Sequence, residues 1–229
     1  MGSKNKLKRF KENETFANVI QPTREELFSE NFSHKGTWNS YFGNSNPIVL
    51  ELGCGKGEYT VGLARKNPNV NYVGIDIKGA RFWRGAKTAV EDGLQNVAFI
   101  RTQIELLEYV FAENEVSEIW ITFPDPQYKF KRTHHRMTNP TFLRHYQQVL
   151  KPSGVVHLKT DSAFLHGYTL GVLDGWGITP EMAHHDIYQY VHAPEDVIDI
   201  QTFYEQQYRD RQIPITYLKF SFPTDGPTA

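Results

Sequence analysis

From Pro47 onward the chain alternates short apolar runs with longer helical patterns, and this alternation limits the possible folds more than any other feature. Five apolar runs read as buried strands: PIVLELG (47–53), NYVGIDI (71–77), VAFIR (97–101), EIWITF (118–123) and GVVHLKT (154–160). Nearly continuous apolar strands separated by helices are typical of a parallel sheet that is covered on both faces. The sequence therefore predicts an α/β, doubly wound fold.

The last third of the chain departs from this pattern. After a helix that is expected to end near residue 173, a weak strand is predicted near 178–184 and a helix near 201–211. The closing run ITYLKFSF (215–222) alternates polar and apolar residues, as a half-buried strand does. We expect it to lie antiparallel near one edge of a mostly parallel sheet.

The first 45 residues are polar and irregular, apart from a short helix predicted at 23–30 after Pro22. The first dozen or so residues carry many basic side chains and are predicted to form a mobile arm. We therefore expect a basic arm and irregular extension over residues 1–45 and a single domain over residues 46–229.

Composition excludes several classes of protein. The lone cysteine, Cys54, rules out a disulfide framework and leaves no cysteine cluster for zinc. No apolar run approaches the length of a membrane-spanning helix, and no apolar core follows the basic residues at the N-terminus, so we predict neither a membrane protein nor a signal peptide. A cytoplasmic protein is expected.

The net charge of −1 hides an uneven distribution of charge. Residues 1–160 hold 22 Lys and Arg against 16 Asp and Glu, whereas residues 161–229 hold 3 against 10. Three stretches are basic and free of acids: Lys4–Lys11, Lys78–Lys87 and Lys129–Arg136. This pattern suits a polyanionic partner on one face, and it equally suits an ordinary solvated surface.

Three glycines follow the first strand of the core, at Gly53, Gly55 and Gly57. Such a turn lets the backbone approach a ligand closely. A dinucleotide site would require its third glycine at position 58, which is Glu58, and no Gly-Lys-Ser/Thr sequence completes a phosphate-binding P-loop. A dinucleotide site and a glycine-rich turn without any ligand remain the alternatives.

Acidic residues accompany this turn. Glu51 would repel a pyrophosphate at the following helix but would favour a cation such as a sulfonium or an amino group. Asp76 ends the next strand, where a carboxylate can accept hydrogen bonds from both hydroxyls of a ribose. Together these residues predict S-adenosylmethionine as the cofactor, with the amide of Gln103 near the adenine.

Asp125 follows the fourth strand and lies between two prolines. These prolines restrict the backbone, so we expect the carboxylate to be held rigidly. Four basic residues follow it without an acid among them, namely Lys129, Lys131, Arg132 and Arg136.

On the predicted helix at 78–92, basic residues recur every three positions around Trp83, which we expect to pack against the sheet. The adjacent histidine pairs point in different directions and lack local acids or cysteines, so no metal site is predicted.

Five segments, ELGCGKG, GIDIKGAR, FPDP with its basic continuation, KTD (159–161) and TFYE (202–205), occur in this order. With them the chain resembles the bacterial tRNA (guanine-N(7)-)-methyltransferases, the TrmB family, from about residue 45 to 222. The resemblance implies a class I S-adenosylmethionine-dependent methyltransferase fold. It also implies tRNA as the partner and transfer of a methyl group to N(7) of a guanine in the variable loop (position 46 in standard tRNA numbering).

The resemblance also implies roles for individual residues. Cofactor contacts are expected at Glu51, Gly53, Asp76, Gln103 and Asp125, with Asp125 also the catalytic residue. Contacts with the guanine are expected at Lys129, Asp161, Thr202, Phe203, Tyr204 and Glu205, and contacts with the RNA at Lys131, Arg132 and Arg136. The chain departs from the family by Gln127-Tyr128 in place of the frequent Trp-Pro, and by Gln103 where Asp or Asn is common. Monomer and homodimer remain open.

Thr202 and Glu205 also fit a capping box at the start of a helix. Two other functions remain as alternatives. A methyltransferase acting on a small molecule or a protein would share the glycine turn but would not need a basic rim. A non-catalytic RNA-binding module would not need intact acids at Glu51, Asp76 and Asp125.

Overall fold

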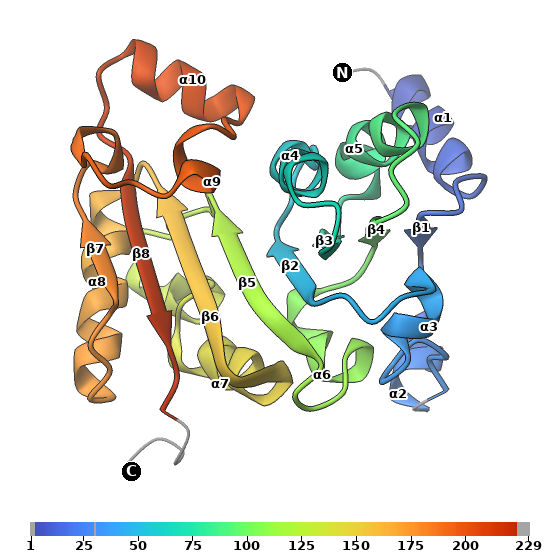
Figure 1. The fold of residues 1–229 in the computed structure, drawn as a ribbon, viewed down its shortest axis with the longest axis horizontal. Helices are drawn as coiled ribbons and strands as arrows, with labels where there is room; N and C mark the ends of the chain where they lie inside the picture. Colours follow the sequence, from blue (N-terminus) through green and yellow to red (C-terminus); the bar gives the residue numbers. More distant parts are fainter. Residues whose placement is uncertain (1–2, 30, 224–229) are drawn as a thin grey trace.

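The computed structural model describes residues 3–29 and 31–223, and within them one mixed sheet forms the centre of the molecule (Figure 1). Its strands lie in the order β1-β4-β3-β2-β5-β6-β8-β7. Their bounds are β1 (Val19–Ile20), β2 (Ile48–Leu52), β3 (Asn71–Ile75), β4 (Val97–Ile100), β5 (Val116–Thr122), β6 (Leu150–Thr160), β7 (Met182–His184) and β8 (Thr216–Ser221). The sequence predicted all of these strands except β1.

Strands β1 to β6 pair in parallel, whereas β8 runs antiparallel to both β6 and β7. This confirms the predicted doubly wound α/β fold with an antiparallel strand near one edge. Strand β3, which follows β2 in the chain, lies on one side of β2, and β5 lies on its other side. The order of the strands therefore reverses at β2, which is the switch point of the sheet. Ligands of doubly wound folds bind at the carboxyl ends of the strands near this point.

Helices cover both faces of the sheet and enclose two hydrophobic cores. One core includes side chains of α2 (Arg24–Phe28), α3 (Trp38–Phe42), α6 (Leu107–Val110), α7 (Pro140–Val149) and α8 (Ala163–Gly175). The other includes side chains of α4 (Glu58–Lys66), α5 (Gly79–Glu91), the short η3 (Ile187–Gln189) and α9 (Glu195–Ile198). The remaining helices are α1 (Ser3–Asn13), η1 (Ile104–Leu106), η2 (Phe130–His135) and α10 (Phe203–Asp210).

The N-terminal segment differs from the irregular arm predicted for it, because residues 3–13 form helix α1, which packs on α5. The Glu12 carboxylate accepts a hydrogen bond from the Trp83 indole at 2.9 Å and pairs with Lys87 at 2.8 Å. The buried amide of Asn13 donates to the carbonyl of Gly79 at 2.9 Å. The prediction of an irregular segment was wrong since these partners lie far away in the sequence. The domain boundary after residue 45 stays a prediction.

The same contacts correct the position predicted for Trp83. Its ring lies against α1, with the Arg9 guanidinium 4.6 Å from the ring centroid. The neighbouring Phe82 packs on the sheet instead, stacked on Phe99 with ring centroids 5.7 Å apart. Docking of α1 therefore places a basic helix beside the carboxyl edge of the sheet, on the opposite side from α10 (Figure 1).

Candidate active site

A tight turn of three glycines joins β2 to α4 at the switch point. Gly53, Gly55 and Gly57 all have positive φ, at 72°, 57° and 73°. A Cβ on Gly57 would lie 2.6 Å from the ring of Phe99, and a Cβ on Gly85 of α5 would lie 2.9 Å from the Gly57 Cα. Glycine is required at these positions because a side chain would push α5 away from the turn.

Glu51 lies one residue before the end of β2 and is only 3% exposed. Its carboxylate accepts hydrogen bonds from the backbone N–H of Thr60 at 2.8 Å, from the hydroxyl of Thr60, and from the hydroxyl of Thr122 at 2.7 Å. Burial raises the pKa of Glu51 to about 7, although these hydrogen bonds oppose the shift. The carboxyl group is therefore close to its titration point at neutral pH, where a nearby cation would favour its ionised form.

Asp76 follows β3 and is 9% exposed. Its two oxygens accept hydrogen bonds from the backbone N–H groups of Gly55 at 3.1 Å and Lys78 at 2.7 Å. The carboxylate thus ties the glycine turn to the start of α5, and it holds the carboxyl ends of β2 and β3 in fixed relation.

A cavity of about 550 Å³ opens beside the glycine turn. Its wall includes Gly53, Cys54 and Gly55 of the turn. The side chains that line it come from both sides of the switch point and include Glu51, Phe123, Thr202, Tyr204, Arg9 and Trp83. Glu51 is the buried acid of this wall and suits a positively charged group of a ligand, while the basic residues that also line the cavity suit a negatively charged group, namely Arg9, Lys56, Arg81 and Arg84.

A second cavity, of about 510 Å³, lies at the ends of β3 and β4. Gln103 lines it together with Leu27, Ile77 and Leu106, and the Ile77 side chain is 52% exposed. Asp76 immediately precedes Ile77 and contacts Gly55 of the first cavity, so it lies between the two. The first cavity thus offers charged groups beside Glu51, and the second offers an apolar surface at Ile77 beside the amide of Gln103.

The segment after β5 places the predicted catalytic residue, Asp125, two positions beyond Phe123 of the first cavity. Phe123 and Gln127 both have φ of 48°, a conformation that is uncommon for residues other than glycine. Phe123 lines the cavity, whereas Asp125 is exposed and does not line it. The Asp125 carboxylate accepts a hydrogen bond from the backbone N–H of Gln127 at 3.1 Å, which fixes its orientation in the turn.

The basic residues that follow divide into two groups. Lys129, Lys131 and Arg132 are exposed, as expected of residues that meet RNA. Arg136 is 6% exposed, and its guanidinium donates two hydrogen bonds of 3.2 Å to the carbonyl of Gln127. It also lies over the rings of Phe164 and Tyr168, at 4.8 and 4.4 Å. In this structure the guanidinium of Arg136 holds the loop against α8, and the RNA contact predicted for this residue stays a prediction.

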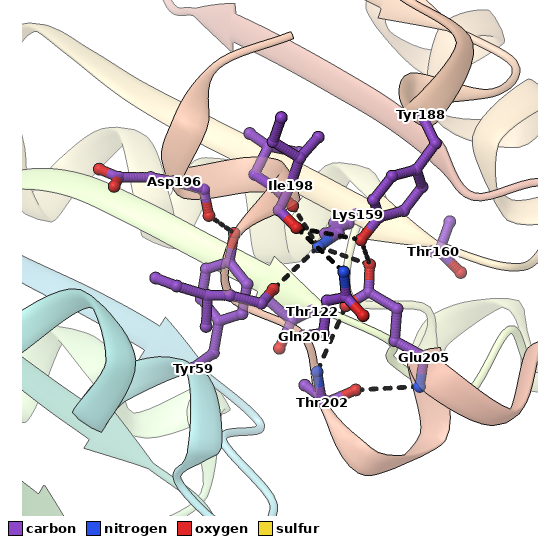
Figure 2. Close-up of polar contacts among 12 residues, drawn as sticks. Tyr59, Thr122, Lys159, Thr160, Tyr188, Asp196, Ile198, Gln201, Thr202 and Glu205 are labelled. Carbon is purple, nitrogen blue, oxygen red and sulfur yellow. Dashed lines mark hydrogen bonds and ion pairs between the residues drawn. The ribbon is translucent and has the colours of Figure 1, made fainter. Parts of the chain in front are cut away.

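A buried ion pair anchors the segment before α10 (Figure 2). The Lys159 ammonium, near the end of β6, lies 2.6 Å from a carboxylate oxygen of Glu205, and both side chains are fully buried. Lys159 also donates to the backbone carbonyls of Val197 and, at 3.2 Å, Ile200, while the Tyr188 hydroxyl donates to Glu205 at 2.7 Å. Burial lowers the pKa of Lys159, and the adjacent carboxylate opposes this shift.

Glu205 also caps α10, and the guanine contact predicted for this residue stays a prediction. Its second oxygen accepts from the backbone N–H of Thr202 at 3.3 Å, and the Thr202 hydroxyl accepts from the backbone N–H of Glu205 at 3.2 Å. The capping box expected at this position is therefore confirmed. With its carboxylate bound to Lys159, Tyr188 and the helix cap, Glu205 holds the helix in place.

The two residues between Thr202 and Glu205 are the exposed part of the segment. Phe203 and Tyr204 are 47% and 52% exposed, and the Lys56 ammonium lies 4.2 Å from the centroid of the Phe203 ring. Tyr204 and Thr202 line the first cavity, whereas Phe203 does not. Asp161, at the end of β6, is partly buried, and this burial raises its pKa while a hydrogen bond from the Tyr208 side chain opposes the rise.

The structure thus gathers Glu51, Gly53, Thr202 and Tyr204 around one cavity and places Gln103 in the second. It leaves other predicted side chains outside both cavities, namely Asp76, Asp125, Lys129, Asp161, Phe203 and Glu205. Sequence reasoning missed Thr60, Thr122 and Lys159. Of these, only Lys159 carried a signal, since a lysine in the apolar run GVVHLKT requires a partner when the strand is buried.

The part of the chain that the structure describes holds neither a metal-binding cluster nor a membrane-spanning helix. Over residues 3–29 and 31–223, no group of three or more His, Cys, Asp or Glu side chains is arranged to hold a metal ion. Within the same residues, no helix has the length and apolar character needed to cross a membrane.

Comparison with known proteins connects this site to a family. A family model described as "Putative methyltransferase" matches residues 45–218. A tRNA (guanine-N(7)-)-methyltransferase of Christiangramia forsetii is 69% identical over 221 residues, which cover 96% of this chain and 99% of the relative. A protein of the same name from Bacteroides thetaiotaomicron is 44% identical, with 97% of this chain and 88% of the relative covered.

Solved structures share the fold at much lower sequence identity. An antibiotic-related methyltransferase matches with a TM-score of 0.59 and 17% identity, covering 91% of this chain and 98% of its own. The 16S rRNA methyltransferase KamB matches with a TM-score of 0.61 and 17% identity, covering 82% and 93%. The sheet and its flanking helices are therefore those of known methyltransferases.

Proposed function

Because this chain belongs to the bacterial family of tRNA (guanine-N(7)-)-methyltransferases, we propose that it methylates N(7) of a guanine in the variable loop of tRNA, with S-adenosylmethionine as the methyl donor. The observation that carries this proposal is the buried Glu51 carboxyl group in the wall of a cavity beside a three-glycine turn. The buried acid suits the positive charge of a sulfonium cofactor, and basic residues of the same wall, such as Lys56 and Arg81, suit its carboxylate.

The residues present fit the cofactor. Its charged end would lie against Glu51 and the glycine turn, its ribose near Asp76, and its adenine near Ile77 and Gln103. When bound, the cofactor supplies an electrophilic methyl group on a positively charged sulfur. The protein contributes a rigid wall that would hold the cofactor in a fixed orientation, because Glu51 is itself fixed by Thr60 and Thr122.

N(7) of guanine carries a lone pair and no proton, so attack requires no general base. Alignment and electrostatic stabilisation are then the main contributions of the protein. Asp125 is exposed, follows the cavity-lining Phe123 by two residues and does not itself line the cavity, and we therefore assign it to the guanine rather than to the cofactor. Its fixed carboxylate can accept hydrogen bonds from the N–H groups on the Watson–Crick edge of the base.

Thr202 and Tyr204 line the cavity together with the glycine turn and would also contact the guanine. Lys131 and Arg132 would neutralise phosphates of the tRNA beside the rim. Since bacterial tRNA is modified in the cytoplasm, we place the enzyme there. A folded tRNA buries most of its bases, so the target must be accessible or extruded.

A single substitution of the RNA tests the proposal. The protein is incubated with methyl-labelled S-adenosylmethionine and a tRNA transcript, and the labelled base is mapped. The matched control is the same tRNA with 7-deazaguanine at the mapped position, which lacks only the accepting nitrogen. We expect stoichiometric label in the first RNA and none in the second. Label on another atom or at another site, or none in either RNA, would refute the proposal.

A further inference from the structure

The loop that follows Asp125 exposes aromatic side chains among its basic ones. Phe130 is 92% exposed and Tyr128 is 64% exposed, and Phe164, at the start of α8, is 41% exposed. The Tyr128 and Phe164 rings lie 5.2 Å apart at an interplanar angle of 43°. We call the three residues Tyr128, Phe130 and Phe164 the aromatic shelf.

The shelf is held in a defined position. Arg136 ties the Gln127 carbonyl to α8 and lies under Phe164. The Thr133 hydroxyl donates to the carbonyl of Phe130 at 2.7 Å, which closes the turn of η2 on which Phe130 stands. No residue of η2 is buried. The Phe130 ring is therefore presented to solvent by a hydrogen-bonded turn, and packing against the core does not explain its position.

Charge around the shelf identifies the kind of partner. Lys129, Lys131 and Arg132 are all exposed, and none of them forms an ion pair with any residue that the structure describes. Exposed rings combined with unpaired cations are the arrangement by which proteins bind unpaired nucleotides, since bases stack on the rings while phosphates meet the cations. A protein partner of ordinary composition would leave these cations unmatched.

We propose that the aromatic shelf is a second RNA subsite, which stacks unpaired bases of the tRNA that flank the target guanine, with Phe130 as the principal stacking residue. This inference rests on the proposed function and extends it beyond the cavity. The loop that carries the shelf also carries Asp125, so stacking there would bring the neighbouring guanine to the rim. The shelf itself touches neither cavity and takes no part in the chemical step.

RNA affinity and its salt dependence distinguish base stacking on the shelf from contacts between phosphates and the basic residues. Binding of a fluorescein-labelled, unstructured oligoadenylate of about ten nucleotides is measured over a series of salt concentrations. Phe130→Ala should weaken this affinity by roughly fivefold or more and leave the slope of log K against log salt unchanged. Phe130→Trp should retain the affinity, whereas Lys131→Ala should flatten the slope. Binding of a blunt, fully paired RNA hairpin should not respond to Phe130→Ala.

The controls make each outcome decisive. Val90→Ala removes an exposed apolar side chain from the far end of α5 and should change none of these quantities. Unchanged oligoadenylate affinity in Phe130→Ala would overturn the inference, and so would a change in self-association without a change in RNA affinity. Methylation of tRNA is assayed in parallel. If the protein methylates tRNA but Phe130→Ala does not change RNA affinity, only the proposed subsite is refuted. If Phe130→Ala weakens RNA binding but no variant, nor the wild type, methylates tRNA, only the proposed methyltransferase function is refuted.

Discussion

The ion pair between Lys159 and Glu205 allows the sharpest test of how the site is held together. Substitution Lys159→Met removes one charge and leaves the Glu205 carboxylate fully buried with only Tyr188 and the cap of α10 as partners. Breaking a buried pair in this way costs about 3–5 kcal/mol of unfolding free energy. For a chain of this size the melting temperature should fall by about 6–20 °C.

The double variant Lys159→Met/Glu205→Gln removes both charges. The single amide oxygen can still accept from the Thr202 N–H and keep the cap, while the amide NH2 can donate to the Tyr188 hydroxyl in place of the lost acceptor. We expect it to be about 2 kcal/mol more stable than Lys159→Met alone, because no uncompensated charge remains. Urea unfolding at neutral pH measures both. The matched control is the exposed pair of Lys219 and Glu181, at 2.7 Å, where Lys219→Met should cost no more than about 1 kcal/mol. Equal costs for Lys159→Met and Lys219→Met, or a double variant less stable than Lys159→Met, would refute the reasoning.

Three further predictions concern the cavity and its rim. Because the pKa of Glu51 is raised from 4.5 to about 7, the stability of the wild type relative to Glu51→Gln should be greatest below pH 4.5 and should fall by about 3 kcal/mol as the pH rises to 7. Urea midpoints at a series of pH values measure this, and a constant difference would contradict it. Asp125→Ala should lower turnover by about 10²–10³-fold while tRNA binding survives, and a fully active variant would exclude Asp125 from the reaction. Replacing Lys131 and Arg132 by Ala should reduce the slope of log K against log salt for tRNA by roughly 0.7–0.9 per lost phosphate contact. Lys151→Ala, at the start of β6 and therefore far from the carboxyl ends of the strands, should leave this slope unchanged.

The ligand class of the glycine turn could be predicted from the spacing of its residues in the sequence. Glu58 in place of a third spaced glycine argued against a dinucleotide, and Glu51 argued for a cationic ligand. Both residues can be read from the printed sequence because the turn and its acid are only a few residues apart. The structure adds that Glu51 is held by Thr60 and Thr122 and is buried deeply enough to titrate near neutrality, which depends on packing that spacing does not reveal.

Arg136 and Glu205 show the opposite case. Both are charged residues in segments that the sequence assigned to RNA or guanine, yet both are buried and satisfied by partners within the protein. Arg136 meets Phe164 and Tyr168, which lie about thirty positions further along the chain. Since a charged residue in a functional segment serves equally well as a contact or as an anchor, its role is decided only by what surrounds it.

The sequence by itself determined the parallel strands from β2 to β6, the antiparallel β8, the cap of α10, the cofactor class and the family, because apolar periodicity, caps and tight turns depend on residues within a few positions of one another. Tertiary structure decided that α1 is a docked helix, that Glu51 is bound by Thr122, and that Lys159 anchors the segment before α10. Each of these depends on contacts between residues distant in the chain, such as Glu12 with Lys87, whose energy exists only after the sheet has brought them together.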